Sequence, residues 1–130
     1  MLNDVIERRK STRYNTSAHV FMKGAQHPTN ARAYIPEYFE GEAVLKDISI
    51  TGCHLESTVQ VTATPGTTCV ITIQPEPASK IKEFDIPAEV RWIRATDYSC
   101  QIGFAILESP SGKYFQRYVD YLSWRATQQS

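Results

Sequence analysis

Two short polar stretches of this sequence carry the residue types that bind charged ligands. The first, "ERRKSTRYN" at 7–15, holds Arg8, Arg9, Lys10 and Arg13. A guanidinium group pairs bidentately with phosphate, so the cluster suits an anionic ligand. Without these four residues, the remaining 10 basic residues face 14 acidic ones, so the rest of the chain is net acidic. Taken alone, such a cluster is more typical of a solvated tail.

The second stretch is "KDISITGCHLES" at 46–57. Asp47 and Ser49 stand two positions apart on a predicted strand, so both side chains are expected on one face. Gly52 permits a tight turn or the close approach of another segment. A carboxylate beside a hydroxyl offers a small surface that accepts N–H donors. Asp and Ser also stabilise turns, which is the alternative interpretation of this pair.

No other constellation in the sequence predicts chemistry. We find no nucleophile–base pair, no glycine-rich phosphate loop and no cluster with metal-ligand spacing, so we expect neither an enzyme nor a metal protein. The three histidines are scattered and predict neither a metal site nor a base: His19, His27 and His54. The three cysteines are widely spaced without a CxxC motif, which predicts small buried thiols in a reducing compartment: Cys53, Cys69 and Cys100.

Length and composition predict one globular domain. The chain has 130 residues, of which 42% are hydrophobic and 22% charged, values ordinary for a globular protein. We divide it into a basic N-terminal arm at 1–16 and a single domain at 17–130. No apolar run is long enough to span a bilayer, and the N-terminal segment lacks the apolar region of a signal peptide. We therefore expect a cytoplasmic protein that is not membrane-spanning.

Period-two alternation of apolar residues, as in Ile71 and Ile73 or in Ile86 and Val90, predicts that the domain is mainly antiparallel β-sheet. We expect a first strand at 18–23 and, because of its Pro and Gly residues, a long connection at 24–42. Trp92 falls on the apolar side of its strand with Val90, so core packing is its stronger interpretation, and Gly103 predicts a bulge or a close strand contact. The remaining strands are predicted at 42–50, 53–57, 67–74, 83–95 and 98–107.

The pattern changes to a helical one at the C-terminus. Phe115, Tyr118, Val119 and Leu122 follow i, i+3, i+4, i+7 spacing, which predicts an amphipathic helix over about 110–127. About six short strands and one helix are most economically arranged as a closed barrel, because closure removes exposed strand edges. The predicted fold is thus a six-stranded antiparallel β-barrel with a C-terminal amphipathic helix and a flexible basic N-terminal arm.

The two polar stretches together resemble the motifs of the PilZ domain family, receptors for the bacterial second messenger cyclic di-GMP. Arg9 to Arg13 forms RxxxR, preceded by Arg8, and Asp47 to Gly52 forms DxSxxG. The order of the motifs and the strand-rich middle agree, and the resemblance covers essentially the whole chain. One departure is the separation of 34 positions between Arg13 and Asp47, which is longer than we expect for the family. The additional residues fall in the predicted loop at 24–42.

The resemblance implies a PilZ-type β-barrel and a role for each motif residue. Arg9 and Arg13 would hold phosphates and guanine edges, with Arg8 as a further contact that favours an intercalated ligand dimer. Asp47 would accept from guanine N1–H and N2–H, and Gly52 would let the chain pass close to the ligand. Ser49 would bind a polar group of the ligand, and Trp92 resembles a position where relatives place an aromatic ring against a base.

In the implied mechanism, cyclic di-GMP orders the arm over the barrel, and an unidentified downstream protein reads the changed surface. No cofactor beyond this ligand and no DNA or RNA partner is expected, and a homodimer is compatible with the sequence. Two alternatives remain open. A small barrel with a basic arm could bind single-stranded nucleic acid, or a PilZ-like adaptor could bind only protein.

Overall fold

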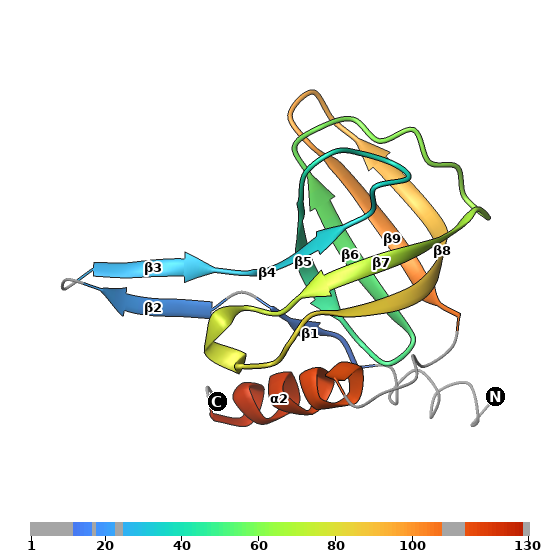
Figure 1. The fold of residues 1–130 in the computed structure, drawn as a ribbon. Helices are drawn as coiled ribbons and strands as arrows, with labels where there is room; N and C mark the ends of the chain where they lie inside the picture. The colour runs from blue at the N-terminus through green and yellow to red at the C-terminus, as the bar shows by residue number, and fades with distance from the viewer. Residues whose placement is uncertain (1–11, 17, 23–24, 108–113, 129–130) are drawn as a thin grey trace.

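Six antiparallel strands close into a barrel in this chain (Figure 1). The computed structural model describes residues 12–16, 18–22, 25–107 and 114–128. Around the barrel the strands follow the order β4, β5, β6, β9, β8, β7, and β7 pairs again with β4. The barrel strands are β4 (Ala31–Tyr34), β5 (Ala43–Ile48), β6 (Gly52–Ser57), β7 (Thr68–Gln74), β8 (Phe84–Ala95) and β9 (Cys100–Ile106). The predicted fold class is confirmed.

Three further strands precede the barrel in sequence. β1 (Tyr14–Asn15) pairs with the end of β5. β2 (Ala18–Met22) and β3 (Ala25–Thr29) pair only with each other, and this ribbon projects sideways from the barrel (Figure 1). A short 3₁₀ helix, Pro77–Ser79, connects β7 to β8.

The prediction was wrong about which segment supplies the sixth barrel strand. The strand expected at 18–23 exists as β2 but lies outside the barrel, and the expected connection at 24–42 contains β3 and β4. Pro28 signals a break, yet a two-stranded ribbon consists only of edge strands, where Pro is tolerated. β4 is four residues long and faces the core with Ala31 and Ala33, whose strand propensity is low.

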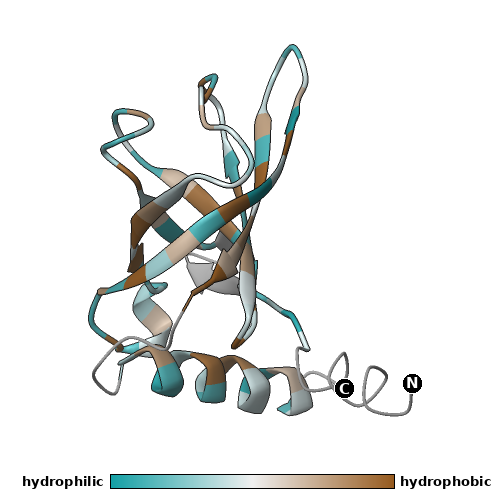
Figure 2. Ribbon diagram, turned by 90° about the vertical axis from the view of Figure 1, so that its right-hand side faces the viewer, coloured by the Kyte–Doolittle hydropathy of each residue, from teal (hydrophilic) through white to brown (hydrophobic). Residues whose placement is uncertain are grey.

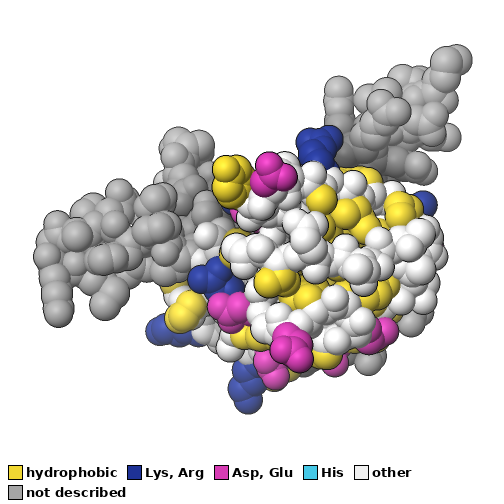
Figure 3. Space-filling model, turned by 90° about the horizontal axis from the view of Figure 1, so that it is seen from above, with side chains coloured by type: hydrophobic (Ala, Val, Ile, Leu, Met, Phe, Trp, Pro, Cys, Tyr) yellow, Lys and Arg dark blue, Asp and Glu magenta, His cyan; other side chains and the backbone are white. Residues whose placement is uncertain are grey.

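The barrel interior is filled by the predicted alternating residues. Ile71 and Ile73 of β7 and Ile86 and Val90 of β8 are fully buried, which removes their apolar surface from water. Figure 2 shows the corresponding alternation of hydrophobic and hydrophilic residues along the strands. Figure 3 views the barrel end away from the helix and shows side chains packed across it, with charged groups around the rim.

The C-terminal helix α2 (Tyr114–Gln128) lies across the other end of the barrel (Figures 1 and 2). Its four predicted apolar residues are all buried, and the rings of Phe115 and Tyr118 each contact Phe84, with centroids 6.0 Å apart. The predicted apolar stripe is confirmed. The predicted helix start near 110 lies outside the described residues.

All three cysteines are free and buried, as predicted. Burial raises the pKa of Cys53 to about 12 and that of Cys69 to about 11, so both thiols are protonated and unreactive at neutral pH. Among the residues that the structure describes, no helix is long and apolar enough to cross a membrane.

Candidate functional site

The DxSxxG motif forms the hairpin between β5 and β6. β5 ends at Ile48, and the backbone N–H of Ser49 donates to the carbonyl of Gly52 at 2.8 Å. The Ser49 hydroxyl accepts from the backbone N–H of Thr51 at 3.2 Å and of Gly52 at 3.1 Å. Ser49 is fully buried, so in this structure its hydroxyl stabilises the turn rather than facing solvent.

The expectation that Asp47 and Ser49 share one strand face was wrong, because the strand ends between them. A register shift between Leu45 and Asp47 also leaves two successive side chains, Lys46 and Asp47, only partly buried. Such a bulge re-aims side chains at a sheet surface. It places the Asp47 carboxylate on the outer face of the barrel.

Arg13, the last residue of the RxxxR motif, lies beside this carboxylate. Its Nη1 lies 3.1 Å from Asp47 Oδ1, with 49% of the Arg13 side chain and 27% of the Asp47 side chain exposed. β1, which follows Arg13, pairs Asn15 with Asp47, and the Thr16 hydroxyl donates to the Leu45 carbonyl. The chain leading from the basic arm is thus anchored beside β5.

Gly52 makes this arrangement possible. A Cβ atom at this position would stand 2.7 Å from the carbonyl oxygen of Phe104 and 2.9 Å from Nη2 of Arg13. Neither distance leaves room for a side chain, so glycine lets the guanidinium lie directly over the strand. The predicted close approach at Gly52 is confirmed.

Trp92 lies at the surface, so the predicted core packing was wrong. A bulge between Val90 and Trp92 reverses the alternation of β8, and Trp92 is 41% exposed while Ile93 packs against the core. The indole rests on Gly103 of β9, where a Cβ atom would come within 2.1 Å of Nε1. The close strand contact predicted for Gly103 is therefore confirmed, and glycine provides the space for the ring.

Arg13, Asp47 and Trp92 line an open pocket with a volume of about 210 Å³. A ligand site for a drug-sized molecule commonly occupies ~300–1,000 Å³, so this pocket is suited to one part of a larger ligand. Its lining combines a cation, an anion, an imidazole ring and an exposed indole ring. The lining residues are Arg13, Asp47, His54, Trp92 and Gly103.

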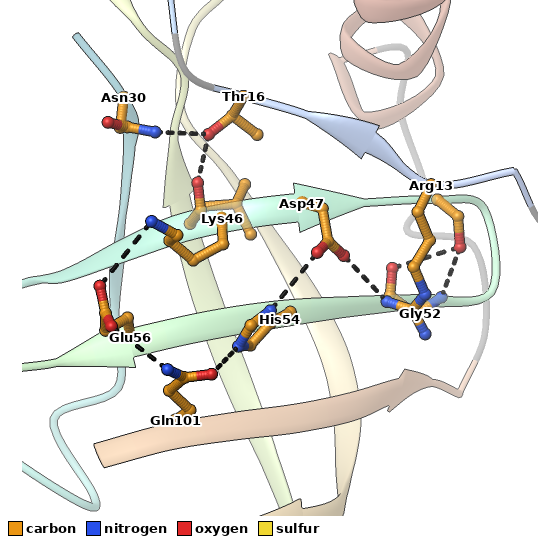
Figure 4. Close-up of polar contacts among 11 residues, drawn as sticks. Arg13, Thr16, Asn30, Lys46, Asp47, Gly52, His54, Glu56 and Gln101 are labelled. Carbon is orange, nitrogen blue, oxygen red and sulfur yellow. Dashed lines mark hydrogen bonds and ion pairs between the residues drawn. The ribbon is translucent and has the colours of Figure 1, made fainter. Parts of the chain in front are cut away.

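Figure 4 shows two pocket-side residues that the sequence analysis did not identify as functional, His54 and Gln101. His54 Nδ1 lies 3.4 Å from Asp47 Oδ2, and its Nε2 lies 3.0 Å from Gln101 Oε1. The His54 ring also lies 5.3 Å from that of Trp92, between centroids. Counting the hairpin register outward from the turn would have paired Asp47 with His54, which is the signal that was available.

Of the predicted site residues, the structure brings Arg13, Asp47, Gly52 and Trp92 together. Ser49 lies beneath them in the turn. Arg8 and Arg9 lie outside the described residues. Within the part of the chain that the structure describes, no group of three or more His, Cys, Asp or Glu side chains could hold a metal ion.

Comparison with known proteins agrees with this architecture. The fold resembles that of the Bacillus subtilis inhibitor of motility, MotI/DgrA, with a TM-score of 0.65 and 14% sequence identity; the match covers 95% of this chain and 53% of that one. This chain therefore spans about half the length of that protein. Comparison with curated protein sequences gives no significant match.

The family comparison covers both motifs. The model of the PilZ domain matches residues 7–123, a range that includes RxxxR at 9–13, DxSxxG at 47–52 and most of α2. This chain therefore belongs to the PilZ domain family.

Proposed function

We propose that this protein is a receptor for cyclic di-GMP that acts by binding, without chemistry on the ligand. The observation that carries the proposal is the convergence of both motifs on one pocket. Arg13 pairs with Asp47 over the backbone of Gly52, and the exposed face of Trp92 lies beside them.

Each pocket group suits one part of a guanine nucleotide. The Asp47 carboxylate accepts from guanine N1–H and N2–H, and Trp92 offers an exposed ring for stacking. The Arg13 guanidinium pairs with a phosphate or with guanine O6 and N7. Because the pocket volume of about 210 Å³ suits one base, Arg8 and Arg9 on the arm supply the remaining contacts.

Binding requires Arg13 and Asp47 to exchange one partner for another. Their mutual ion pair is partly exposed to water. Exposed pairs contribute only about 0.2–1 kcal/mol, so a ligand that offers each residue a better partner displaces the pair. The arm then folds over the ligand, and a downstream protein reads the new surface. The similar fold belongs to an inhibitor of motility, which makes control of motility one candidate output.

Calorimetry with cyclic di-GMP on the wild-type protein and on Arg13→Ala and Asp47→Ala tests the proposal. Loss of a charged partner is expected to reduce the binding free energy by about 1.5–3 kcal/mol, which is roughly a tenfold to hundredfold loss of affinity. Arg32→Ala is the matched control, because Arg32 on β4 forms a similarly exposed pair with Glu42, with 3.4 Å between Nε and Oε1.

Three results would count against the receptor. Equal affinity in Arg13→Ala, Asp47→Ala and Arg32→Ala would remove the proposed site. Binding of oligonucleotides with a steep salt dependence would favour a single-strand binder instead. Failure to bind either ligand would favour a protein-binding adaptor. The same titration gives the stoichiometry, for which Arg8 favours two ligands per chain.

A further inference from the structure

A chain of side-chain contacts runs from the pocket across the outer face of β5, β6 and β9 (Figure 4). Asp47 Oδ2 lies 3.4 Å from His54 Nδ1, and His54 Nε2 lies 3.0 Å from Gln101 Oε1. The Gln101 Nε2 then donates to Glu56 Oε2 at 3.4 Å. The Glu56 carboxylate ends the chain and pairs with Lys46, whose Nζ lies 3.8 Å from Oε1.

The two carboxylates at the ends of this series of contacts determine how many hydrogen bonds His54 and Gln101, which lie between them, must donate. Ionised carboxylates only accept, so Asp47 and Glu56 each need a hydrogen from the inner neighbour. Gln101 donates to Glu56 and therefore presents its carbonyl oxygen to His54. His54 must then donate from both ring nitrogens, which only the imidazolium can do.

No neutral arrangement of the same side chains satisfies all three contacts. A neutral His54 with its hydrogen on Nε2 turns the Nδ1 lone pair toward the Asp47 carboxylate. Rotating the Gln101 amide by half a turn lets a neutral His54 donate to Asp47. That rotation places the Gln101 carbonyl against the Glu56 carboxylate, so one acceptor–acceptor contact remains in each case.

Charged groups lie near His54 on β5, beside β1 and on β8, while β9 contributes the neutral Gln101. Lys46 on β5 is paired with Glu56, and Arg13 beside β1 is paired with Asp47. On β8, the indole of Trp92 lies 5.3 Å from the His54 ring, and Arg94 lies over that indole at 5.8 Å. The two groups that touch the His54 nitrogens are therefore a carboxylate and an amide carbonyl, both acceptors.

We propose that His54 is a positioning residue of the nucleotide site, which orients the Asp47 carboxylate for guanine only while it is an imidazolium. The inference rests on the proposed function, since it assumes that Asp47 receives the guanine edge. Its consequence is a proton linkage. Affinity for cyclic di-GMP is therefore expected to be high at mildly acidic pH, where both His54 ring nitrogens can donate, and to fall as the pH rises.

Binding isotherms for cyclic di-GMP at about pH 6 and about pH 8, which bracket the usual titration of histidine, test the linkage. The wild-type dissociation constant is expected to rise about tenfold between the two. In His54→Gln the dissociation constant is expected to be the same at both pH values, because the amide does not titrate. An equal pH dependence in His54→Gln and wild type would overturn the proposal.

Gln101→Met separates hydrogen-bond matching from simple charge effects. This substitution removes the acceptor at His54 Nε2 without changing any charge. A neutral His54 can then donate from Nδ1 to Asp47, so the pH dependence of the dissociation constant should largely disappear. Gln74→Met is the matched control, since Gln74 lies on β7 and accepts from the Tyr34 hydroxyl at 3.0 Å. It should keep the wild-type pH dependence, and a loss equal to that of Gln101→Met would overturn the proposal.

An NMR titration of the His54 imidazole in ligand-free protein makes the two failures distinguishable. The titration midpoint should be lower in Gln101→Met than in wild type and unchanged in Gln74→Met. Equal titration midpoints in wild type and Gln101→Met would contradict the claim that the hydrogen bond to Gln101 favours the imidazolium form of His54. If the wild type binds no cyclic di-GMP at either pH, the proposed function fails, and this titration still decides whether His54 donates from both nitrogens.

Discussion

Two arginine–carboxylate pairs of this chain use the same chemistry in opposite surroundings. Arg13 and Asp47 form a pair at the pocket with 49% and 27% of their side chains exposed. Arg125 of α2 and Glu76, which precedes the 3₁₀ helix, form a pair with 12% and 0% exposed. The first pair is in contact with water and the second is nearly excluded from it.

Further hydrogen bonds support the buried pair. Arg125 Nη1 lies 2.5 Å from one Glu76 carboxylate oxygen, and the Tyr118 hydroxyl donates to the other at 2.5 Å. Arg125 Nη2 also donates to the carbonyl of Asn15 in β1 at 2.6 Å. Burial and the Glu76 charge raise the pKa of Tyr118 far above its usual range, so this hydroxyl remains a donor. The cluster joins the helix to the barrel and to β1.

The difference between the pairs lies in the consequence of losing a partner. A buried carboxylate without its cation is desolvated and uncompensated, whereas an exposed one regains water. The Arg125–Glu76 pair is therefore suited to holding the structure, and the Arg13–Asp47 pair to being exchanged for a ligand. Two substitutions test this contrast, and a third tests the packing of the pocket beside Arg13.

Arg125→Met should produce the largest effect, because it leaves the buried Glu76 charge unpaired. We expect the free energy of unfolding to fall by about 3–5 kcal/mol, measured by urea denaturation. The double variant Glu76→Gln and Arg125→Met removes the charge and keeps an acceptor for Tyr118, so it should be more stable than Arg125→Met alone. A single variant as stable as wild type would contradict the structural role of this pair.

Gly103→Ala should produce an intermediate effect at the pocket. The new Cβ would meet the Trp92 indole, and accommodating such a clash typically costs about 1–3 kcal/mol. Denaturation measures the loss, and adding Trp92→Leu should restore part of the stability because the smaller side chain leaves space for the methyl group. No loss in Gly103→Ala would show that the indole does not rest on β9.

Arg13→Ala should have the smallest effect on stability, about 0.2–1 kcal/mol, although it should weaken cyclic di-GMP binding. The comparison with Arg125→Met in the same denaturation series sharpens the contrast between the two pairs. A loss in Arg13→Ala comparable to that in Arg125→Met would show that the pocket pair is structural, and the argument for ligand exchange would fail.

The elements that bury one face completely were predictable from the sequence. In β7 and in the first part of β8, alternation identified Ile71, Ile73, Ile86 and Val90 as core, and helical spacing identified the buried face of α2. The strand β4 was missed because Ala31 and Ala33 give a weak apolar signal, although both are fully buried. Small residues fill the core there without providing a pattern.

The candidate site was predictable only where a motif names its residues. The resemblance identified Arg13, Asp47 and Trp92 as candidate site residues, but it did not predict the ion pair between Arg13 and Asp47, and strand alternation placed Trp92 in the core. A bulge shifts alternation by one residue, and nothing in "VRWIR" (90–94) distinguishes a bulged strand from a regular one. His54 and Gln101 were missed because their meeting depends on the register between β6 and β9.

The sequence by itself determined the class of fold, the buried faces of the long strands and the helix, and the family to which both motifs belong. These properties depend on local periodicity and on residue identity, which the chain carries directly. Only the tertiary structure decided that Ser49 supports a turn, that Trp92 faces the pocket, and that one arginine–carboxylate pair is buried while the other is exposed. Burial and strand register depend on residues far apart in the chain, so the same side-chain chemistry acquires its role only when the barrel closes.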